Sequence, residues 1–89
     1  MQVQQTAKFK KAYKKLHVNQ RQELNKALEI IIKDPTIGEQ KKGDLSWLRV
    51  HKCNIINQLT LIGYQVDDQQ LILVFVAFGP HENFYRDLK

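Results

Sequence analysis

The stretch Leu71–Phe78, LILVFVAF, decides the fold, and it runs directly into Gly79–Leu88, GPHENFYRDL. An unbroken apolar run of this length between turn signals is typical of a strand buried on both faces of a sheet. The positions that follow supply a histidine, a tyrosine, an arginine and carboxylates directly after Gly79-Pro80. Apolar packing thus gives way to reactive side chains at one junction, which is where we expect the functional site.

The composition indicates one small soluble domain. The chain has 89 residues, 43% hydrophobic and 26% charged, so we expect a single domain, residues 1–89, with one modest core. Its single cysteine, Cys53, excludes an intramolecular disulfide and zinc sites that need two or more cysteines. No apolar run approaches the ~20 residues of a membrane helix, and Met1–Gln5 does not resemble a signal peptide. We therefore expect a cytoplasmic protein that does not contact a membrane.

The positive charge is concentrated in the first half of the chain. The net charge is +5, and residues 1–42 hold ten Lys/Arg against four Asp/Glu, whereas residues 43–89 hold four against five. A polyanion, either nucleic acid or an acidic protein segment, is the natural partner of such a surface. A solvated lysine-rich helix face that serves solubility explains the charge equally well.

The first half predicts an antiparallel helical hairpin. Apolar residues recur at the spacing of one helical face after Thr6, the expected N-cap. They are Phe9, Ala12, Tyr13 and Leu16. For a second helix we expect Asn19 as N-cap, with Gln22 at the capping-box position, and a stop at Asp34-Pro35. Its apolar residues are Leu24, Ala27, Leu28 and Ile31, and whether Ile32 belongs to the same stripe stays open. The short link between the helices directs both apolar faces to one core.

The second half predicts a small sheet. After a loop over Thr36–Asp44, strands are expected at Trp47–Cys53, Gln58–Val66 and Gln70–Phe78, joined by short turns that favour antiparallel order. The third strand is apolar on both faces, so we place it inside the sheet with the helical hairpin over one side. Whether Met1–Gln5 adds an edge strand stays open. The fold class is α+β, with a short C-terminal helix after Gly79-Pro80.

This C-terminal helix carries the first candidate residues. His81 and Tyr85 are one turn apart and could transfer protons during phosphodiester cleavage. Alternatively, His81 caps the helix and Tyr85 packs on the sheet rim. For Arg86, an ion pair with Glu82 four residues earlier is favoured over a direct role at the site.

Cations on the first long strand are the second set of candidates. Arg49 and His51 share a face by alternation and could bind a phosphate, with Lys52 on the opposite face. An ordinary solvated sheet face is the competing interpretation. Trp47 could stack on a base, although a core or rim tryptophan is commoner.

The remaining polar residues carry weaker signals. Lys10, Lys11 and Lys14 are candidates for substrate binding along the first helix. His17 is expected at the surface, and Cys53 is expected to be a small packed residue. The three histidines are scattered, so we expect no metal site and no cofactor.

The order of the predicted elements and three local sequences resemble the RelE/ParE superfamily of bacterial type II toxins. The three sequences are Lys14-Lys15-Leu16, Gly63-Tyr64-Gln65-Val66 and Gly79-x-His81-Glu82-x-Phe84-Tyr85. The resemblance covers essentially the whole chain. It implies a fold similar to that of microbial ribonucleases and a cognate antitoxin that wraps around the toxin.

The resemblance also implies an activity. The RelE-like branch cleaves mRNA on the ribosome, and by position His81 and Tyr85 match residues that act there, while Arg49 and His51 fall on the strand that supplies basic residues. That branch typically carries an arginine on the following strand, where this chain has Thr60, Leu61 and Ile62. We therefore expect a metal-independent mRNA endonuclease that inhibits translation. The alternatives are a ParE-like toxin that binds DNA gyrase without catalysis and a non-catalytic nucleic-acid-binding domain.

Overall fold

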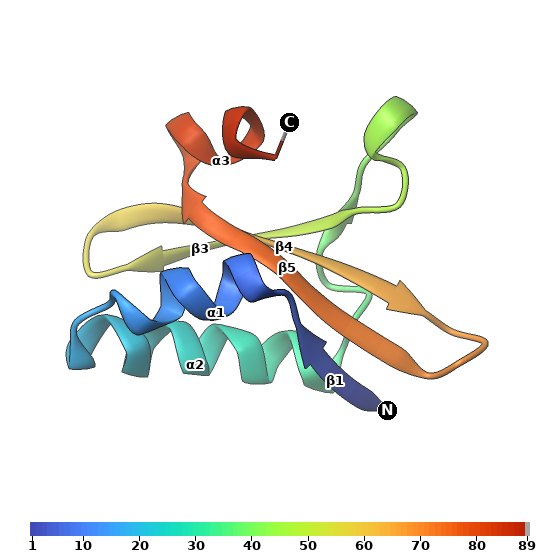
Figure 1. Ribbon diagram of the computed structural model, residues 1–89, viewed down its shortest axis with the longest axis horizontal. Coiled ribbons are helices and arrows are strands. Elements are labelled where there is room, and N and C mark those ends of the chain that lie inside the picture. The colour runs from blue at the N-terminus through green and yellow to red at the C-terminus, as the bar shows by residue number, and fades with distance from the viewer. Residues whose placement is uncertain (89) are drawn as a thin grey trace.

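The computed structural model describes residues 1–88, and its central feature is a five-stranded sheet with helices on both faces (Figure 1). The elements in chain order are β1 (Gln2–Gln5), α1 (Ala7–Lys14), α2 (Val18–Lys33), β2 (Glu39–Gln40), the 3-10 turn η1 (Gly43–Leu45), β3 (Arg49–Ile55), β4 (Gln58–Asp67), β5 (Ile72–Pro80) and α3 (His81–Asp87). Helices α1 and α2 lie on one side of the sheet, and α3 lies on the other (Figure 1). The predicted α+β class, the helical hairpin and the short C-terminal helix are confirmed.

The strand order is β1-β5-β4-β3-β2, so β5 is an interior strand as its apolar sequence predicted. The pairs β2–β3, β3–β4 and β4–β5 are antiparallel, but β1 runs parallel to β5, with Gln2 opposite Ile72. The antiparallel order predicted for the three long strands is confirmed, and the edge strand that the sequence left open at Met1–Gln5 is present. Short turns force antiparallel order only between consecutive strands, whereas β1 reaches β5 through almost the entire chain.

The first helix of the hairpin begins at the predicted cap, whereas the second helix begins at a different residue from the one predicted. The Thr6 hydroxyl accepts a hydrogen bond from the Phe9 amide at 3.1 Å and donates to the Val76 carbonyl at 2.7 Å. The second helix starts earlier than predicted, because His17 is the N-cap and its amide donates to the Gln20 side chain at 2.9 Å. The Asn19–Gln22 capping pair is therefore wrong. A capping box two residues upstream has the same spacing, so the pattern alone did not distinguish them.

The segment predicted as a loop contains two short elements, β2 and η1. Strand β2 pairs with the start of β3, Glu39 opposite Val50, and the Lys41 amide donates to the Leu48 carbonyl at 2.9 Å. A two-residue strand has no detectable sequence period, which explains why it was missed. Its effect is to fix residues 39–41 along the outer edge of β3.

The sheet has a separate core on each face. The first, the hairpin-side core, lies under α1 and α2 and contains Phe9, Leu24, Ala27, Ile31, Ile55, Ile62, Tyr64, Leu73 and Phe75. The second, the α3-side core, contains Leu48, Val50, Leu61, Ala77 and Phe84. Strand β5 contributes Leu73 and Phe75 to the hairpin-side core and Ala77 to the α3-side core, so both of its faces need apolar residues.

Candidate functional site

The pairing of β3 with β4 shows which face each candidate residue of β3 approaches. Lys52 lies opposite Leu61, a member of the α3-side core, whereas His51 lies opposite Ile62 of the hairpin-side core. Directly paired residues point to the same face of a sheet. Lys52 therefore faces α3 and His51 faces α2, as the alternation of the sequence predicted.

Arg49 is also on the hairpin side, where it has structural partners. It is paired with Tyr64, and its guanidinium donates to the carbonyls of Thr36 at 3.3 Å and Gly38 at 2.7 Å. Half-buried His51 lies on the same face, and burial lowers its pKa. Arg49 and His51 thus both lie on the face of the sheet that α2 covers, where the Arg49 guanidinium binds backbone carbonyls.

The mRNA cleavage that the resemblance implies would need Arg49, His51, His81 and Tyr85 on one surface, and the structure does not bring them together. Helix α3 packs on the opposite face of the sheet from Arg49 and His51. Alternation correctly placed the two β3 residues together, but it carries no information about which helix covers which face.

Helix α3 places its two candidate residues in different surroundings. His81 is exposed in the first turn and lines a shallow pocket with Asn57 of the β3–β4 turn and with Gln58 and Leu59 at the start of β4. Tyr85 is half-buried against the α3-side core, with its ring edge-to-face with that of Phe84 at 5.1 Å between centroids.

The predicted Glu82–Arg86 ion pair is wrong. The Arg86 guanidinium instead donates to the Asn83 side chain at 2.6 Å. Asn83 lies three residues earlier on the same helix and offers a neutral acceptor within reach, which draws the guanidinium away from the exposed Glu82. Arg86 is left at the surface of α3.

A residue that the sequence did not single out, Lys41, contacts Tyr85. Its amide continues the β2–β3 ladder opposite Leu48, so its side chain extends over the α3 side. The ammonium lies 5.4 Å from the centroid of the Tyr85 ring and 3.0 Å from a carboxylate oxygen of Glu39. Hydrogen bonding to Tyr85, and then to Glu39, raises the pKa of Lys41.

Glu39 connects Lys41 with the other cations of this region. The hydrogen bond and charge of Lys41 lower the pKa of Glu39, and the more distant charges of Lys52 and Lys42 lower it further. We call Glu39, Lys41, Lys52 and Tyr85 the α3-side cluster. Nothing in the sequence indicated Lys41 or Glu39, because their position depends on the short strand β2.

The other candidates lie away from this cluster. His17 is exposed at the start of α2, and Cys53 is half-buried against the hairpin-side core, where burial raises its pKa. Trp47 is 43% exposed and lines a small polar pocket with Arg49 and Gln40. The lysines of α1 are exposed on the hairpin side: Lys10, Lys11 and Lys14.

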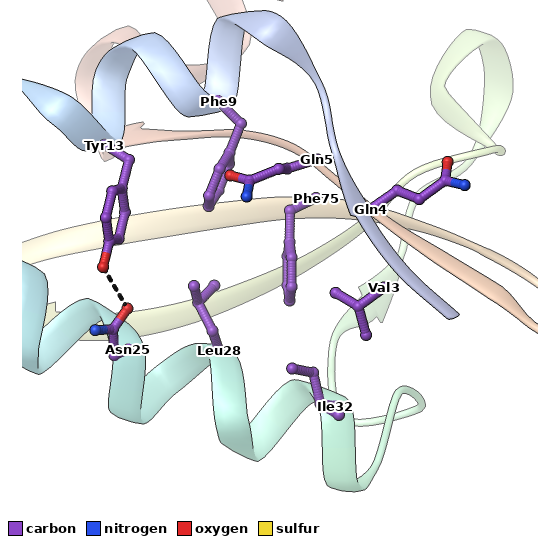
Figure 2. A pocket seen from close by; sticks show the side chains of 9 residues that line it. All are labelled: Val3, Gln4, Gln5, Phe9, Tyr13, Asn25, Leu28, Ile32 and Phe75. Atoms are coloured by element: carbon purple, nitrogen blue, oxygen red, sulfur yellow. Dashed lines mark hydrogen bonds between the residues drawn. The ribbon is translucent and has the colours of Figure 1, made fainter. Parts of the chain in front are cut away.

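A groove of about 300 Å³ lies between β1 and the two N-terminal helices (Figure 2). Figure 2 shows Phe9 and Phe75 at its floor, with Val3 and Ile32 at one end and the Tyr13–Asn25 hydrogen bond, 2.9 Å long, at the other. Val3 and Ile32 are 43% and 41% exposed, so apolar surface is open to solvent next to the edge strand of the sheet.

The part of the chain that the structure describes, residues 1–88, has no group of three or more His, Cys, Asp or Glu side chains able to hold a metal ion. In the same residues, no helix combines the length and the apolar character that crossing a membrane requires.

A helical hairpin on one face of a small mixed sheet and a C-terminal helix on the other define the fold of RelE-like toxins. The structure is similar to RelE in the intact E. coli RelBE toxin-antitoxin complex, with a TM-score of 0.72 at 20% identity over 89% of this chain and 94% of that chain. It is also similar to a mutant of E. coli RelE in the free state, with a TM-score of 0.72 at 19% identity over 98% of this chain and 93% of that chain. A chain of the Mycobacterium tuberculosis RelBE2 toxin-antitoxin complex gives a TM-score of 0.70 at 15% identity over 90% of this chain and 96% of that chain.

The chain belongs to the ParE-like toxin family of type II bacterial toxin-antitoxin systems, whose model matches residues 3–89. No curated protein matches the sequence. The family confirms the resemblance to the RelE/ParE superfamily.

Proposed function

We propose that this toxin is an endoribonuclease that cleaves mRNA on the ribosome and thereby inhibits translation in the cytoplasm. The observation that carries the proposal is that Tyr85 and Lys52 lie on the same side of the sheet, with a further lysine held against the Tyr85 ring. A cationic surface next to a hydroxyl group suits a reaction at a phosphodiester, because negative charge on the phosphate grows in the transition state.

The reaction we propose is attack of a 2′-hydroxyl on its own 3′-phosphate. A bond forms between O2′ and phosphorus, the bond from phosphorus to O5′ breaks, and the products are a 2′,3′-cyclic phosphate and a 5′-hydroxyl. His81 would accept the proton from O2′, and the Tyr85 hydroxyl would donate one to O5′. Lys52 would neutralise the phosphate oxygens. Exposed Arg86, on the same helix, would contact the neighbouring backbone.

The test is incubation of the purified protein with ribosomes that carry a defined mRNA, followed by mapping of the 5′ ends. We expect cleavage by the wild-type protein and at least a ~10²-fold slower reaction for Tyr85→Phe. Arg49→Gln is the matched control, because Arg49 lies on the opposite face. Intact message under conditions where an established ribosome-dependent toxin cleaves would refute the proposal.

The second candidate function is inhibition of DNA gyrase without catalysis. It is favoured by Leu61, an apolar residue on the strand where the ribonuclease branch typically has an arginine. This side chain is fully buried in the α3-side core, so β4 offers no cation to the face that carries Tyr85. A DNA supercoiling assay separates the candidates. Inhibition of gyrase together with intact mRNA would establish the second function instead of the first.

For the antitoxin, we propose that an amphipathic segment with acidic residues occupies the groove next to β1. The groove combines exposed apolar side chains with the unpaired outer edge of β1, and the exposed lysines of α1 lie on the same side of the sheet. Such a segment could add a strand to β1 and place its apolar residues in the groove. Because it would bind the folded state alone, it should raise the Tm.

Ile32→Glu tests this location, with Ile30→Glu as its control. Both residues are exposed on α2, at 41% and 46%, but only Ile32 lines the groove. We expect Ile32→Glu alone to weaken antitoxin binding in calorimetry. Equal weakening by both variants, or an unchanged Tm on adding antitoxin to the wild-type toxin, would contradict the proposed location.

A further inference from the structure

The face that carries Tyr85 lacks a cation at its centre. Leu61 occupies the position on β4 beside Lys52 and is 0% exposed, in contact with the core that contains Phe84 and Ala77. A charged side chain could not replace Leu61 without burying its charge. If this face binds a phosphate, a second positive charge must therefore come from another strand.

We propose that Lys41, at the end of β2, supplies this charge by binding the phosphate at which the RNA is cleaved. The inference rests on the proposed mRNA cleavage, and it assigns a phosphate-binding role to a residue that neither the sequence pattern nor the family match indicates.

Three contacts hold Lys41 in place for this role. Its backbone is fixed by the 2.9 Å hydrogen bond to the Leu48 carbonyl, its ammonium is 3.0 Å from Glu39, and it lies 5.4 Å from the Tyr85 ring centroid. Its side chain is only 21% exposed, which restricts its freedom far more than that of an ordinary surface lysine. An ammonium that is oriented before the substrate arrives loses little entropy on binding a phosphate.

The carboxylate of Glu39 offsets the repulsion among the neighbouring lysines in the free protein. It lies among Lys41, Lys42 and Lys52, all of which favour its ionised form. Its own side chain is 69% exposed, so it can swing away when a phosphate enters. The phosphate would replace the carboxylate as the partner of Lys41 and Lys52, with Tyr85 adjacent to the leaving oxygen. Lys41 would neutralise charge and take no part in proton transfer.

The competing explanation is that Lys41 serves only to hold β2 through its ion pair with Glu39. Lys41→Gln and Glu39→Gln break the same ion pair, so a purely structural pair predicts equal effects. A phosphate ligand predicts unequal effects, because only Lys41→Gln removes the positive charge. Lys41→Arg retains the charge and should recover part of the loss.

The experiment measures single-turnover cleavage of mRNA on ribosomes at saturating toxin. We expect Lys41→Gln to slow cleavage by about 10²–10³-fold, the usual effect of losing one donor to a developing negative charge. Glu39→Gln should change the rate by no more than about fivefold, as expected for an exposed ion pair. Equal losses for both variants, or a wild-type rate for Lys41→Gln, would overturn the proposal. Circular dichroism and Tm must show that each variant is folded.

A second measurement separates this proposal from the proposed function. Ribosomes that carry a message with a 2′-deoxynucleotide at the cleavage position cannot react, so binding can be measured alone. Lys41→Gln should weaken binding about tenfold relative to Glu39→Gln. If the wild-type protein cleaves no message, the proposed function fails, and this binding comparison still decides whether Lys41 contacts phosphate. Equal affinities of the two variants would refute that contact.

Discussion

The substitution Gly63→Ala tests the packing that holds α3, and with it Tyr85, on the sheet. A Cβ atom added to Gly63 would lie 2.7 Å from Cζ of Phe84 and 3.2 Å from Cδ1 of Leu48. Phe84 is 2% exposed and Leu48 is 0% exposed, so neither ring nor methyl has free space to move into. Overpacking of this kind costs about 1–3 kcal/mol. Gly63→Ala should therefore lower the Tm by about 5–20 °C in a domain of this size.

Gly79→Ala is the matched control on the neighbouring strand. A Cβ atom at Gly79 would meet no atom within 4 Å, and its backbone does not have a positive φ. Alanine restricts the unfolded chain more than glycine does, so Gly79→Ala should leave stability unchanged or raise it by up to ~1 kcal/mol. Urea unfolding followed by circular dichroism measures both variants, and hydrogen exchange shows whether the loss is concentrated in α3. If Gly63→Ala is as stable as Gly79→Ala, the packing of Phe84 over Gly63 is refuted.

Three further substitutions examine other parts of the molecule. Tyr64→Phe should cost about 1–3 kcal/mol of unfolding free energy, because the hydroxyl donates to the Pro35 carbonyl at 2.7 Å and accepts from the Gly38 amide at 2.9 Å; an unchanged urea midpoint would contradict this. Burial lowers the pKa of His51 below its ordinary 6.5, so as the pH falls the unfolded chain takes up a proton first and stability declines. His51→Gln should thus lose less stability than the wild type between about pH 7.5 and pH 5.5, and parallel losses would argue against it. Tyr85→Phe should unfold within about 1 kcal/mol of the wild type, since its ring packing is retained and only the polar contact of its hydroxyl is lost; a large loss would mean that its effect on cleavage is structural.

The sequence predicted the elements with a clear period and the contacts that depend on them. The stripe of α1, the cap at Thr6 and the interior position of β5 all follow from local patterns, and all were confirmed. The separation of Lys52 from His51 followed from alternation alone. Each of these features depends on a residue and its near neighbours in the chain, so it could be predicted from a single sequence.

Two errors were local, because the His17–Gln20 capping pair and the Asn83 acceptor compete with the predicted partners at similar spacing. The features that the sequence did not indicate depend on partners distant in the chain. The parallel pairing of β1 with β5 and the position of Lys41 against Tyr85 both join segments far apart in sequence. Arg49 was a candidate for binding a phosphate, but its guanidinium is held by carbonyls of the segment after α2. No period in the sequence records which face a remote helix will cover, so the composition of the α3-side cluster required the structure.

The pairing of β1 with β5 also determines when the protein can complete its fold during synthesis. Gln2 is synthesised long before its partner Ile72, and Thr6 long before the Val76 carbonyl that accepts its hydrogen bond. The first strand therefore remains without its neighbour until β5 has left the ribosome, and α3 with Tyr85 follows later still. Contacts of such long sequence separation also slow folding. The α3-side cluster therefore cannot assemble on a nascent chain until α3 has emerged behind β5.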